Sequence, residues 1–387
     1  MMEIKSCTNC LMDTTDSAIS FNENGVCNYC TDYEISYANG YFGNQVVVKE
    51  DYSYQFNKLI ETVKRYKSSR SKYDCLIGIS GGVDSCYVVY LMKKHKINPL
   101  ILHIDTGWNS ELAVSNIQKT VEYSGFDFFT EIVDWDEMKA LQNAYLKSGI
   151  SNQDVPQDQI IFKTLYDYAR KYKISTFVTG SNIATEYVNP KSWHRGSALD
   201  TRSLKYIYKT YGSGKKLRKY KLMSFIEYYI LIPFIYRIRT VRPLNYINYD
   251  RNEAIKTMSN EFGWTNYGYK HGESLFTKLF QNYYLPKRYG FDKRKPHLSS
   301  MILSGQITRE EALSVLNEDL YDKGELQKDI KYFCKKLGIK QDDFEDLLNL
   351  PLKYHDDFPN NTKLIVYITK LKNLLLNRFN IRITVNQ

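Results

Sequence analysis

Apolar runs that alternate with helical spacing predict the organisation of the middle of the chain. Five runs have the length and composition of buried strands and lie at residues 73–79, 99–104, 126–133, 174–178 and 240–244. Helical spacing follows the first run from Ser85 onward and precedes the fourth over residues 160–169. Strands that alternate with helices of this length form a parallel sheet covered by helices. The pattern therefore predicts an α/β fold with a parallel sheet.

The C-terminal third of the chain carries helix signals instead. Asp250 and Glu253 have the spacing of a helix N-cap and its reciprocal partner, and Thr308 and Glu311 repeat that spacing. Leucines and isoleucines at helical spacing over residues 363–379 predict a last helix. We expect a mostly helical C-terminal region.

No stretch of the sequence is predicted to span a membrane. The strongest apolar run, residues 222–238, is interrupted by Glu227 and Pro233 and is shorter than the roughly 20 residues that a spanning helix needs. We expect this run to be buried or docked on the surface. With 25% charged and 43% hydrophobic residues and no apolar signal core near its start, the chain is predicted to be a globular cytoplasmic protein.

Positive charge is concentrated in one part of the sequence. The net charge is +10, and residues 191–250 contain thirteen Lys or Arg residues but three acids. Such a segment suits an anionic partner. The candidates are nucleic acid, an acidic membrane surface and a phosphorylated small molecule. A solvated basic face with no specific ligand is the alternative. The 34 tyrosines add little to the case for base stacking, and nucleic acid is not the expected partner.

Four of the seven cysteines lie close together near the N-terminus. Cys7 and Cys10, then Cys27 and Cys30, form two Cys-x-x-Cys pairs separated by 16 residues, a spacing typical of tetrahedral zinc sites. Four thiolates around Zn²⁺ leave no open position, so such a site stabilises the fold and takes no part in catalysis. An iron–sulfur cluster uses the same ligands and is the main alternative, whereas the reducing cytosol disfavours disulfides. We predict a structural zinc module.

A glycine-rich loop, Ser80-Gly81-Gly82-Val83-Asp84-Ser85, follows the first predicted strand and precedes a helix. Glycines allow backbone N–H groups to turn toward phosphate oxygens, and the helix N-terminus adds positive potential. Ser80 and Ser85 offer hydroxyl donors, and Asp84 is a candidate ligand for a Mg²⁺ ion that bridges phosphates. The Gly-Lys-Ser/Thr of a Walker loop is absent, which favours binding of a pyrophosphate group over transfer of the terminal phosphoryl group.

This loop resembles the signature of the PP-loop ATP pyrophosphatases, Ser-Gly-Gly-x-Asp-Ser, at every fixed position. The resemblance implies a Rossmann-like nucleotide domain that binds ATP through Ser80, Gly81, Gly82, Val83, Asp84 and Ser85. The second and fourth strands agree with it, because ligands of open parallel sheets gather at the carboxyl ends of the strands. Further candidates for nucleotide binding at these ends are Asp105, Gly180, Ser181, Asn182 and Glu186. A helix-capping role for Asp105 and a plain surface position for Glu186 are the alternatives.

Enzymes of this family activate a substrate oxygen as an adenylate, and the nucleophile that displaces AMP then distinguishes them. A sulfur-transfer enzyme would need a catalytic pair of cysteines in the nucleotide domain. Only Cys75 and Cys86 lie there, and we expect both to be small buried packing residues. Ammonia is therefore the favoured nucleophile. The sequence has no Gly-x-Cys-x-Gly nucleophile elbow and no N-terminal cysteine, so ammonia is expected from solution or from a partner subunit.

A dense series of polar residues in the C-terminal half, from residue 263 to residue 312, narrows the family. Together with the N-terminal cysteines, this series resembles the sequence pattern of the N-acetyl sugar amidotransferases. These enzymes act in the biosynthesis of bacterial surface polysaccharides such as LPS O-antigen and capsule. The resemblance implies that ATP drives conversion of an acetamido group of a nucleotide-activated sugar into an acetamidino group, with AMP and pyrophosphate as products. It also implies a glutaminase partner related to that of imidazole glycerol phosphate synthase, in some members joined by its barrel partner.

The same resemblance suggests roles for individual residues. The expected catalytic residues are Ser80, Asp84 and Glu273, the last as a base for the attacking ammonia. Candidates for binding the phosphates or a carboxylate of the sugar nucleotide are Lys270, His271, Lys293, Arg294 and His297. For each of these residues, a structural polar role at a domain contact is the alternative.

The sequence thus predicts three domains. They are a four-cysteine zinc module over residues 1–45, a PP-loop domain over 46–250 with a basic insertion at 191–238, and a helical substrate-binding region over 251–387. Two other functions stay open. The basic insertion and the zinc knuckle also suit a tRNA-modifying PP-loop enzyme of the thiolation type, and a non-catalytic nucleotide-binding scaffold docked to envelope machinery is the third possibility.

Overall fold

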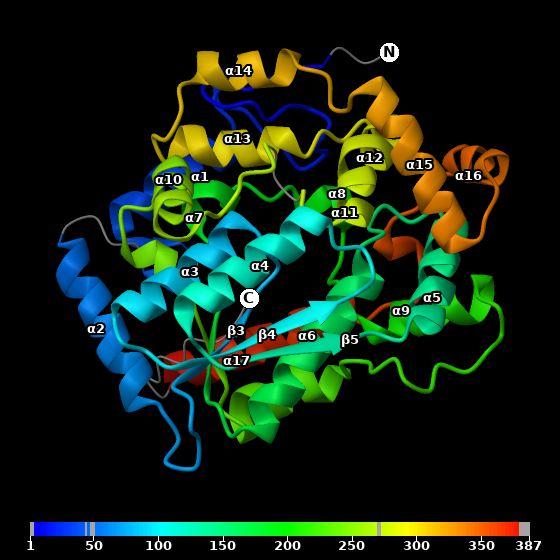
Figure 1. Ribbon diagram of the computed structural model, residues 1–387. Coiled ribbons are helices and arrows are strands. Elements are labelled where there is room, and N and C mark those ends of the chain that lie inside the picture. The colour runs from blue at the N-terminus through cyan, green and yellow to red at the C-terminus, as the bar shows by residue number, and fades with distance from the viewer. Residues whose placement is uncertain (1–3, 43–44, 47–50, 269–271, 379–387) are drawn as a thin grey trace.

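A parallel sheet of five strands lies at the centre of the computed structural model, which describes residues 4–42, 45–46, 51–268 and 272–378 (Figure 1). The strands are β3 (Cys75–Gly78), β4 (Pro99–Asp105), β5 (Phe128–Ile132), β6 (Thr176–Val178) and β7 (Arg239–Val241). Their order across the sheet is β5-β4-β3-β6-β7, and every neighbouring pair is parallel. The predicted fold class is confirmed.

The fifth strand departs most from its predicted position. It covers residues 239–241, and Pro243–Tyr246 form a short 3₁₀ helix, η2. Proline has no N–H to donate to a ladder, so sheet pairing ends before Pro243.

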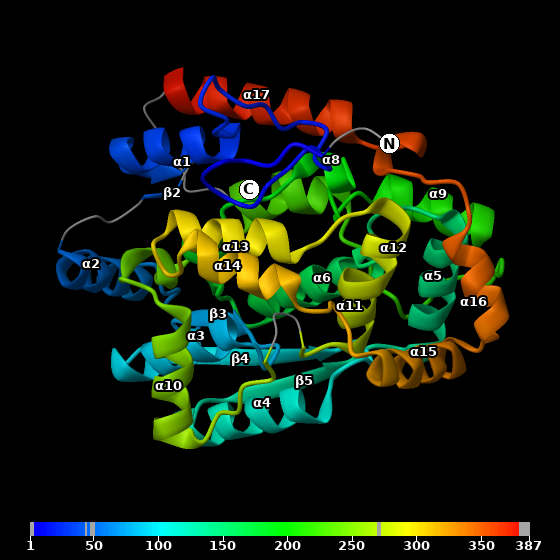
Figure 2. The same ribbon diagram turned by 90° about the horizontal axis from the view of Figure 1, so that it is seen from above.

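Helices cover both faces of the sheet, as Figures 1 and 2 show. Side chains of β3 point alternately to the two faces, so Cys75 and Ile77 pack in one core cluster and Leu76 in another. The first face is covered by α2 (Tyr52–Arg65), α3 (Val83–Lys94), α4 (Glu111–Ser124) and α10 (Arg251–Phe262). The second face is covered by α6 (Val155–Lys171) and the π-helix η1 (Glu227–Ile235). Burial on both faces explains why the strand sequences are continuous apolar runs.

The predicted helix N-caps are present. Asp250 accepts a hydrogen bond from the backbone N–H of Glu253 at 2.8 Å, and Thr308 and Glu311 form a reciprocal capping box. Helix α3 begins at Val83, two residues before the predicted start. These caps place the beginnings of α10 and α14.

Helices also dominate the rest of the chain, and the C-terminal region is mostly helical, as predicted. The remaining helices are α5 (Trp135–Ser148), α7 (Ile183–Glu186), α8 (Lys191–His194), α9 (Thr201–Tyr211), α11 (Leu275–Leu279), η3 (Phe280–Tyr284), α12 (Leu285–Tyr289), α13 (Arg294–Leu303), α14 (Arg309–Asn317), α15 (Lys323–Leu337), α16 (Gln341–Leu348), η4 (His355–Asp357) and α17 (Thr362–Arg378). Phe276 of α11 and Phe333 of α15 pack against Trp108, which follows β4 and is almost fully buried. The helical region and the loop after β4 therefore share an aromatic core.

The N-terminal segment contains α1 (Asn28–Asn39) and the two short strands β1 (Tyr41–Phe42) and β2 (Gln45–Val46). Its cysteine-containing part docks on α13 and α14, beside which it runs in dark blue in Figure 1. The backbone N–H of Leu11 donates to Ser299 Oγ at 3.0 Å, and Arg309 donates to the carbonyl oxygen of Cys7 at 3.3 Å. The division into three domains stays a prediction.

The apolar run at residues 222–238 is docked on the surface, one of its two expected placements. Met223 and Ile232 of this run are buried against the second face of the sheet, while Ile226 and Ile235 are exposed. Among the described residues, none of the helices has the length and apolar character needed to cross a membrane.

Candidate active site and metal centre

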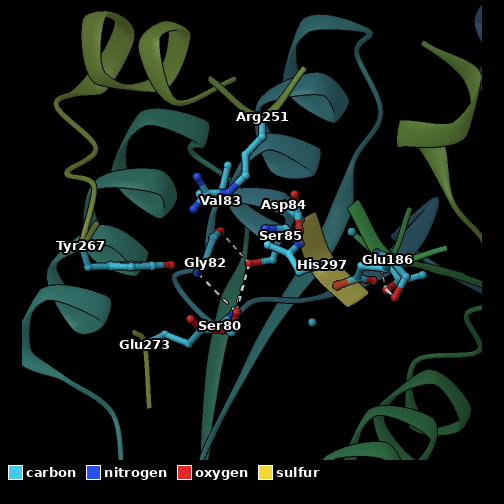
Figure 3. Close-up of a pocket in the computed structure, with 14 residues that line it drawn as sticks. Ser80, Gly82, Val83, Asp84, Ser85, Glu186, Arg251, Tyr267, Glu273 and His297 are labelled. Carbon is cyan, nitrogen blue, oxygen red and sulfur yellow. Dashed lines mark hydrogen bonds between the residues drawn. The ribbon is translucent and has the colours of Figure 1, made fainter. Parts of the chain in front are cut away.

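The loop after β3 turns sharply into α3 and keeps its hydroxyl groups together (Figure 3). Gly81 has a φ of +86°, a conformation that residues with side chains rarely adopt. The hydroxyl oxygens of Ser80 and Ser85 lie 3.3 Å apart, and the N–H of Gly82 donates to Ser80 Oγ at 3.3 Å. Helix α3 begins directly after Gly82, so its first N–H groups add positive potential. This geometry suits an anion such as phosphate.

The loop after β6 packs directly against the loop after β3. A Cβ atom at Gly180 would lie 2.7 Å from the backbone carbonyl carbon of Asp84 and 2.9 Å from the backbone nitrogen of Ser85, so only glycine permits this approach. The strand order reverses between β3 and β6. The two loops therefore meet at the topological switch point, where open parallel sheets bind their ligands.

These two loops line a pocket of about 230 Å³, and residues of the C-terminal half complete its wall (Figure 3). The lining residues are Gly78, Ser80, Gly82, Val83, Asp84, Ser85, Thr179, Gly180, Ser181, Glu186, Arg251, Tyr267, Glu273 and His297. The pocket brings together most residues predicted to bind the nucleotide and two candidates from the C-terminal half, Glu273 and His297.

Gly81 and Asn182, two other predicted nucleotide-binding residues, lie outside this lining. The carbonyl oxygen of Gly81 accepts hydrogen bonds from Trp264 Nε1 and the Tyr267 hydroxyl, each at 3.3 Å. Asn182 caps α7 by accepting a hydrogen bond from the backbone N–H of Thr185 at 2.9 Å. Both residues shape the loops that carry the lining.

A hydrogen-bonded chain behind the loop connects Asp105, which also lies outside the lining, with the end of β3. Asn109 Nδ2 lies 3.0 Å from Asp105 Oδ1 and 2.9 Å from His103 Nε2. His103 Nδ1 lies 2.9 Å from the carbonyl oxygen of Ile79, and because that oxygen can only accept, Nδ1 carries the proton. Burial lowers the pKa of His103, in agreement with the neutral ring. In this structure Asp105 contributes to the position of the residue that precedes Ser80.

Glu273 reaches the pocket because the segment around it pairs with the loop after β4. The N–H of Ser110 donates to the carbonyl oxygen of Glu273 at 2.9 Å, and the N–H of Leu275 donates to that of Trp108 at 2.9 Å. A Cβ atom at Gly82 would lie 3.4 Å from Glu273 Oε1. A carboxylate from the helical region therefore stands beside the phosphate loop.

His297 enters the same pocket from α13. Its Nδ1 lies 2.9 Å from the carbonyl oxygen of Thr185 in α7, so Nδ1 carries the proton in this contact. The bond joins the helical region to the loop after β6.

The other residues predicted to bind the substrate are placed differently. Arg294 forms an ion pair with Asp292 at 2.8 Å and donates to carbonyl oxygens at the end of α14. Its guanidinium therefore supports the packing of α13 on α14, and neither Arg294 nor Lys293 is part of the pocket lining. Lys270 and His271 lie outside the described residues.

Two tyrosines that the sequence analysis did not single out for this site hold the phosphate loop. Tyr249 donates its hydroxyl to Asp84 Oδ1, and burial, followed by the charge of Asp84, raises the pKa of Tyr249 far above its usual value. Burial, followed by the charge of Glu273, likewise raises the pKa of Tyr267, whose hydroxyl donates to Gly81. Both phenols stay protonated donors. Tyrosine is too frequent in this chain for either position to stand out.

Arg251 is the third residue that the sequence analysis missed. It is the one arginine or lysine in the pocket lining, as far as the chain is described. It follows the N-cap Asp250 directly, so the predicted start of α10 was the only signal for its position.

The four N-terminal cysteines form a closed cluster. All are fully buried, and their sulfur atoms lie within 4.8 Å of one another. The Sγ–Sγ distances are 3.8 Å for Cys7 and Cys30, and 3.6 Å for both Cys10–Cys27 and Cys27–Cys30. Four sulfurs at about 2.3 Å from one tetrahedral ion would lie about 3.8 Å apart. The cluster could therefore hold a single metal ion.

Residues 273–372 match the family model described as "LPS biosynthesis protein WbpG-like, C-terminal domain". The matched segment begins at Glu273 and includes His297, so both C-terminal pocket residues lie in it. The match confirms, for this part of the chain, the resemblance to a family of surface-polysaccharide biosynthesis. No curated protein matches the sequence.

Three solved structures resemble parts of the chain. NMN synthetase from Francisella tularensis has 17% identity and a TM-score of 0.28 over 36% of this chain, and the chain spans 58% of its length. NH3-dependent NAD synthetase from Campylobacter jejuni has 17% identity and a TM-score of 0.29, with 41% and 73% of the two chains covered. U34-tRNA thiolase NcsA from Methanococcus maripaludis, with its [4Fe-4S] cluster, has 16% identity and a TM-score of 0.36, with 84% and 93% covered.

Proposed function

We propose, on the premise that the C-terminal part of this chain is a WbpG-like domain, that the protein is an ATP-dependent amidotransferase. Its substrate is an acetamido group of a nucleotide-activated sugar. The amide oxygen attacks the α-phosphorus of ATP and pyrophosphate leaves. Ammonia then adds to the activated carbon, AMP leaves with that oxygen, and an acetamidino group remains.

One observation carries this proposal: the phosphate loop, the loop after β6 and two residues of the WbpG-like domain line one pocket. An adenylating site needs a binding site for the pyrophosphate portion of ATP next to a binding site for the substrate that accepts the adenylyl group. Ser80, Gly82 and Ser85 supply the first, and Glu273 and His297 from the matched segment supply the second.

The chain's own groups bind and position the nucleotide. Backbone N–H groups at the start of α3 and the two serine hydroxyls hold the pyrophosphate portion, where preorganised donors stabilise charge that develops as it leaves. Arg251 adds the cationic charge that a Walker lysine would provide. Tyr249 holds the carboxylate of Asp84 in one orientation. Asp84 would hold Mg²⁺, which when bound neutralises phosphate charge.

The burial of the two cysteines at the sheet favours ammonia over sulfur as the nucleophile. Cys75 and Cys86 are both fully buried, and burial raises the pKa of the Cys86 thiol to about 11. A protonated, buried thiol is a poor sulfur carrier, which counts against thiolation of tRNA. Glu273 is the base that takes a proton from ammonia as it adds.

The cysteine cluster is a structural zinc site in this proposal. Its sulfur separations suit one tetrahedral ion, whereas a four-iron cluster binds each cysteine to a different iron atom and holds the sulfurs farther apart. When bound, zinc supplies folding energy to the segment that docks on α13 and α14.

Product analysis tests the reaction. The purified chain, with ATP, Mg²⁺, ammonium and acetamido sugar nucleotides, is expected to form AMP and pyrophosphate in step with amidine, and Ser80→Ala and Asp84→Ala should abolish this turnover. Ser314→Ala and Asp319→Ala, at exposed positions, are matched controls and should keep the wild-type rate. Formation of ADP and orthophosphate alone, or full activity of either loop variant, would refute the proposal.

A glutaminase partner is proposed as the source of ammonia. The isolated chain should use ammonium but not glutamine, and the added partner should confer glutamine dependence. Equal use of glutamine by the chain alone would contradict the partner. Binding of tRNA that tightens steeply at low salt, with no turnover of any sugar nucleotide, would instead favour a tRNA-modifying enzyme.

A further inference from the structure

The π-helix η1 presents apolar side chains to solvent and turns its charge inward. Three residues of η1, together with its N-cap Ile226, form an exposed apolar ridge. The exposed fractions are 58% for Ile226, 39% for Ile230, 44% for Phe234 and 64% for Ile235. Glu227 points the other way, where it is buried and bound to Lys163 at 2.7 Å. The outer face of a helix packed on a globular protein normally carries polar side chains instead. Grouped exposed apolar side chains mark an interaction surface.

Beside the apolar ridge lies a cavity of about 920 Å³ that is ringed by cations. This basic cavity is lined by Arg70, Arg170, Lys171, Lys173, Lys221 and Arg237, with Asp167 as the one acid. Ile235 belongs to the same lining, so the apolar ridge and the basic cavity are continuous. Of the six cations, Arg170 alone forms ion pairs within the described part of the chain. The cavity therefore carries a large excess of positive charge.

The basic cavity lies at the amino ends of the strands. Ser175 precedes β6, Ile238 precedes β7, and Arg70 belongs to the segment before β3, and all three line it. The nucleotide pocket lies at the carboxyl ends of the same strands. The two sites therefore lie at opposite ends of the strands, and a ligand bound at one site leaves the other site open.

We propose that the apolar ridge and the basic cavity form a docking surface for an anionic phospholipid bilayer. Lipid phosphates enter the basic cavity, and the isoleucine and phenylalanine side chains of the ridge enter the boundary between headgroups and acyl chains. Apolar side chains flanked by Lys and Arg are what an interfacial segment needs, because hydrophobic insertion and attraction to anionic lipid then add. The nucleotide pocket faces away from the bilayer in this arrangement.

The composition of the ridge distinguishes a bilayer from other anionic partners. Nucleic acid is bound by cations together with aromatic side chains that stack on bases, but three of the four ridge residues are isoleucines, which cannot stack. The two tyrosines of the cavity lining, Tyr66 and Tyr236, already lie under the guanidinium groups of Arg239 and Arg170. An acidic protein surface would neutralise the cavity, yet it would also have to cover the exposed apolar ridge next to it. A bilayer accepts both features with no matched shape.

Vesicle sedimentation with the full wild-type chain tests the proposal. Binding is expected to vesicles of phosphatidylcholine with 30 mol% phosphatidylglycerol and not to pure phosphatidylcholine, and it should weaken when NaCl rises from about 50 to 500 mM because salt screens exposed charges. Equal binding to both vesicles, or none to either, would overturn the proposal. Retention of RNA or of polyglutamate by a chain that leaves vesicles unbound would also overturn it.

Variants separate the two parts of the surface. Lys221→Glu and Arg237→Glu should each weaken vesicle binding by roughly fivefold or more, and Phe234→Ser with Ile235→Ser by roughly tenfold or more. Ile132→Ser and Lys256→Glu make the same kinds of change at exposed sites elsewhere and should bind like the wild type. Equal losses in the control variants would refute the assignment to this surface. The exposed positions and an unchanged Tm exclude misfolding as the cause.

Discussion

Replacement of Gly180 by alanine tests whether two loops hold the nucleotide between them. The new Cβ would lie 2.7 Å from the backbone carbonyl carbon of Asp84 and 2.9 Å from Ser85 N, whereas non-bonded carbon atoms prefer about 3.5–4.0 Å. Both contacts are with backbone, so the loops have to separate by roughly 1 Å. Such overpacking costs about 1–3 kcal/mol, and a 1 Å displacement at a reacting site can cost about 10²-fold in rate.

We therefore expect Gly180→Ala to weaken ATP binding at least tenfold and to lower the Tm by a few degrees. Isothermal titration with ATP and thermal unfolding measure the two effects without knowledge of the sugar. Gly324→Ala is the matched control, because a Cβ there meets nothing closer than the tip of Asp322 at 3.3 Å. Wild-type affinity in Gly180→Ala would refute the argument that the two loops form one nucleotide site. A lower Tm with unchanged affinity would refute it as well.

Three further predictions concern the metal, a half-buried carboxyl group and the aromatic core. Chelation should remove one zinc per chain in elemental analysis and abolish hydrogen-exchange protection over residues 4–42, and recovery of iron with sulfide would contradict the zinc assignment. Burial and then the charge of Asp154 raise the pKa of Asp158 to about 8, so this carboxyl binds its proton more tightly in the folded state and costs stability as pH rises from about 4 to 8. Asp158→Asn should accordingly have a higher Tm than the wild type at pH 8 but not at pH 4, whereas Asp319→Asn at an exposed position should show no such gain, and a pH-independent difference for Asp158→Asn would count against this reading. Trp108→Ala should lower the free energy of unfolding in urea by about 3–5 kcal/mol, since it leaves a cavity in the core shared by the loop after β4 and the helical region, and a loss below about 1 kcal/mol would argue against that core.

Local patterns in the sequence were sufficient for the sheet, the phosphate loop and the cysteine cluster. Strands buried on both faces are continuous apolar runs, and the loop and the two Cys-x-x-Cys pairs are defined by residues that are neighbours in the chain. The one sizeable shift in the sheet, at β7, came from a proline whose missing N–H ends the ladder. The division into domains stays a prediction.

Residues of the helical region were harder to place, as Arg294 and His297 illustrate. Both are polar and only three positions apart, yet Arg294 binds Asp292 and the end of α14, while His297 lines the pocket. Their difference depends on which side of α13 meets which neighbour. Polarity at helical spacing does not report that.

The sequence by itself determined that this chain has a parallel sheet with a pyrophosphate-type loop, four clustered cysteines and a helical C-terminal region, because each of these is specified by residues close together in the chain. The tertiary structure alone decided that Glu273 stands beside Gly82, that Tyr249 holds Asp84, and that η1 leaves one row of apolar side chains exposed. The physical reason is the same in each case. These contacts join segments that are separated by up to about 190 residues or depend on which face of a helix is packed, and packing is settled only when the whole core forms.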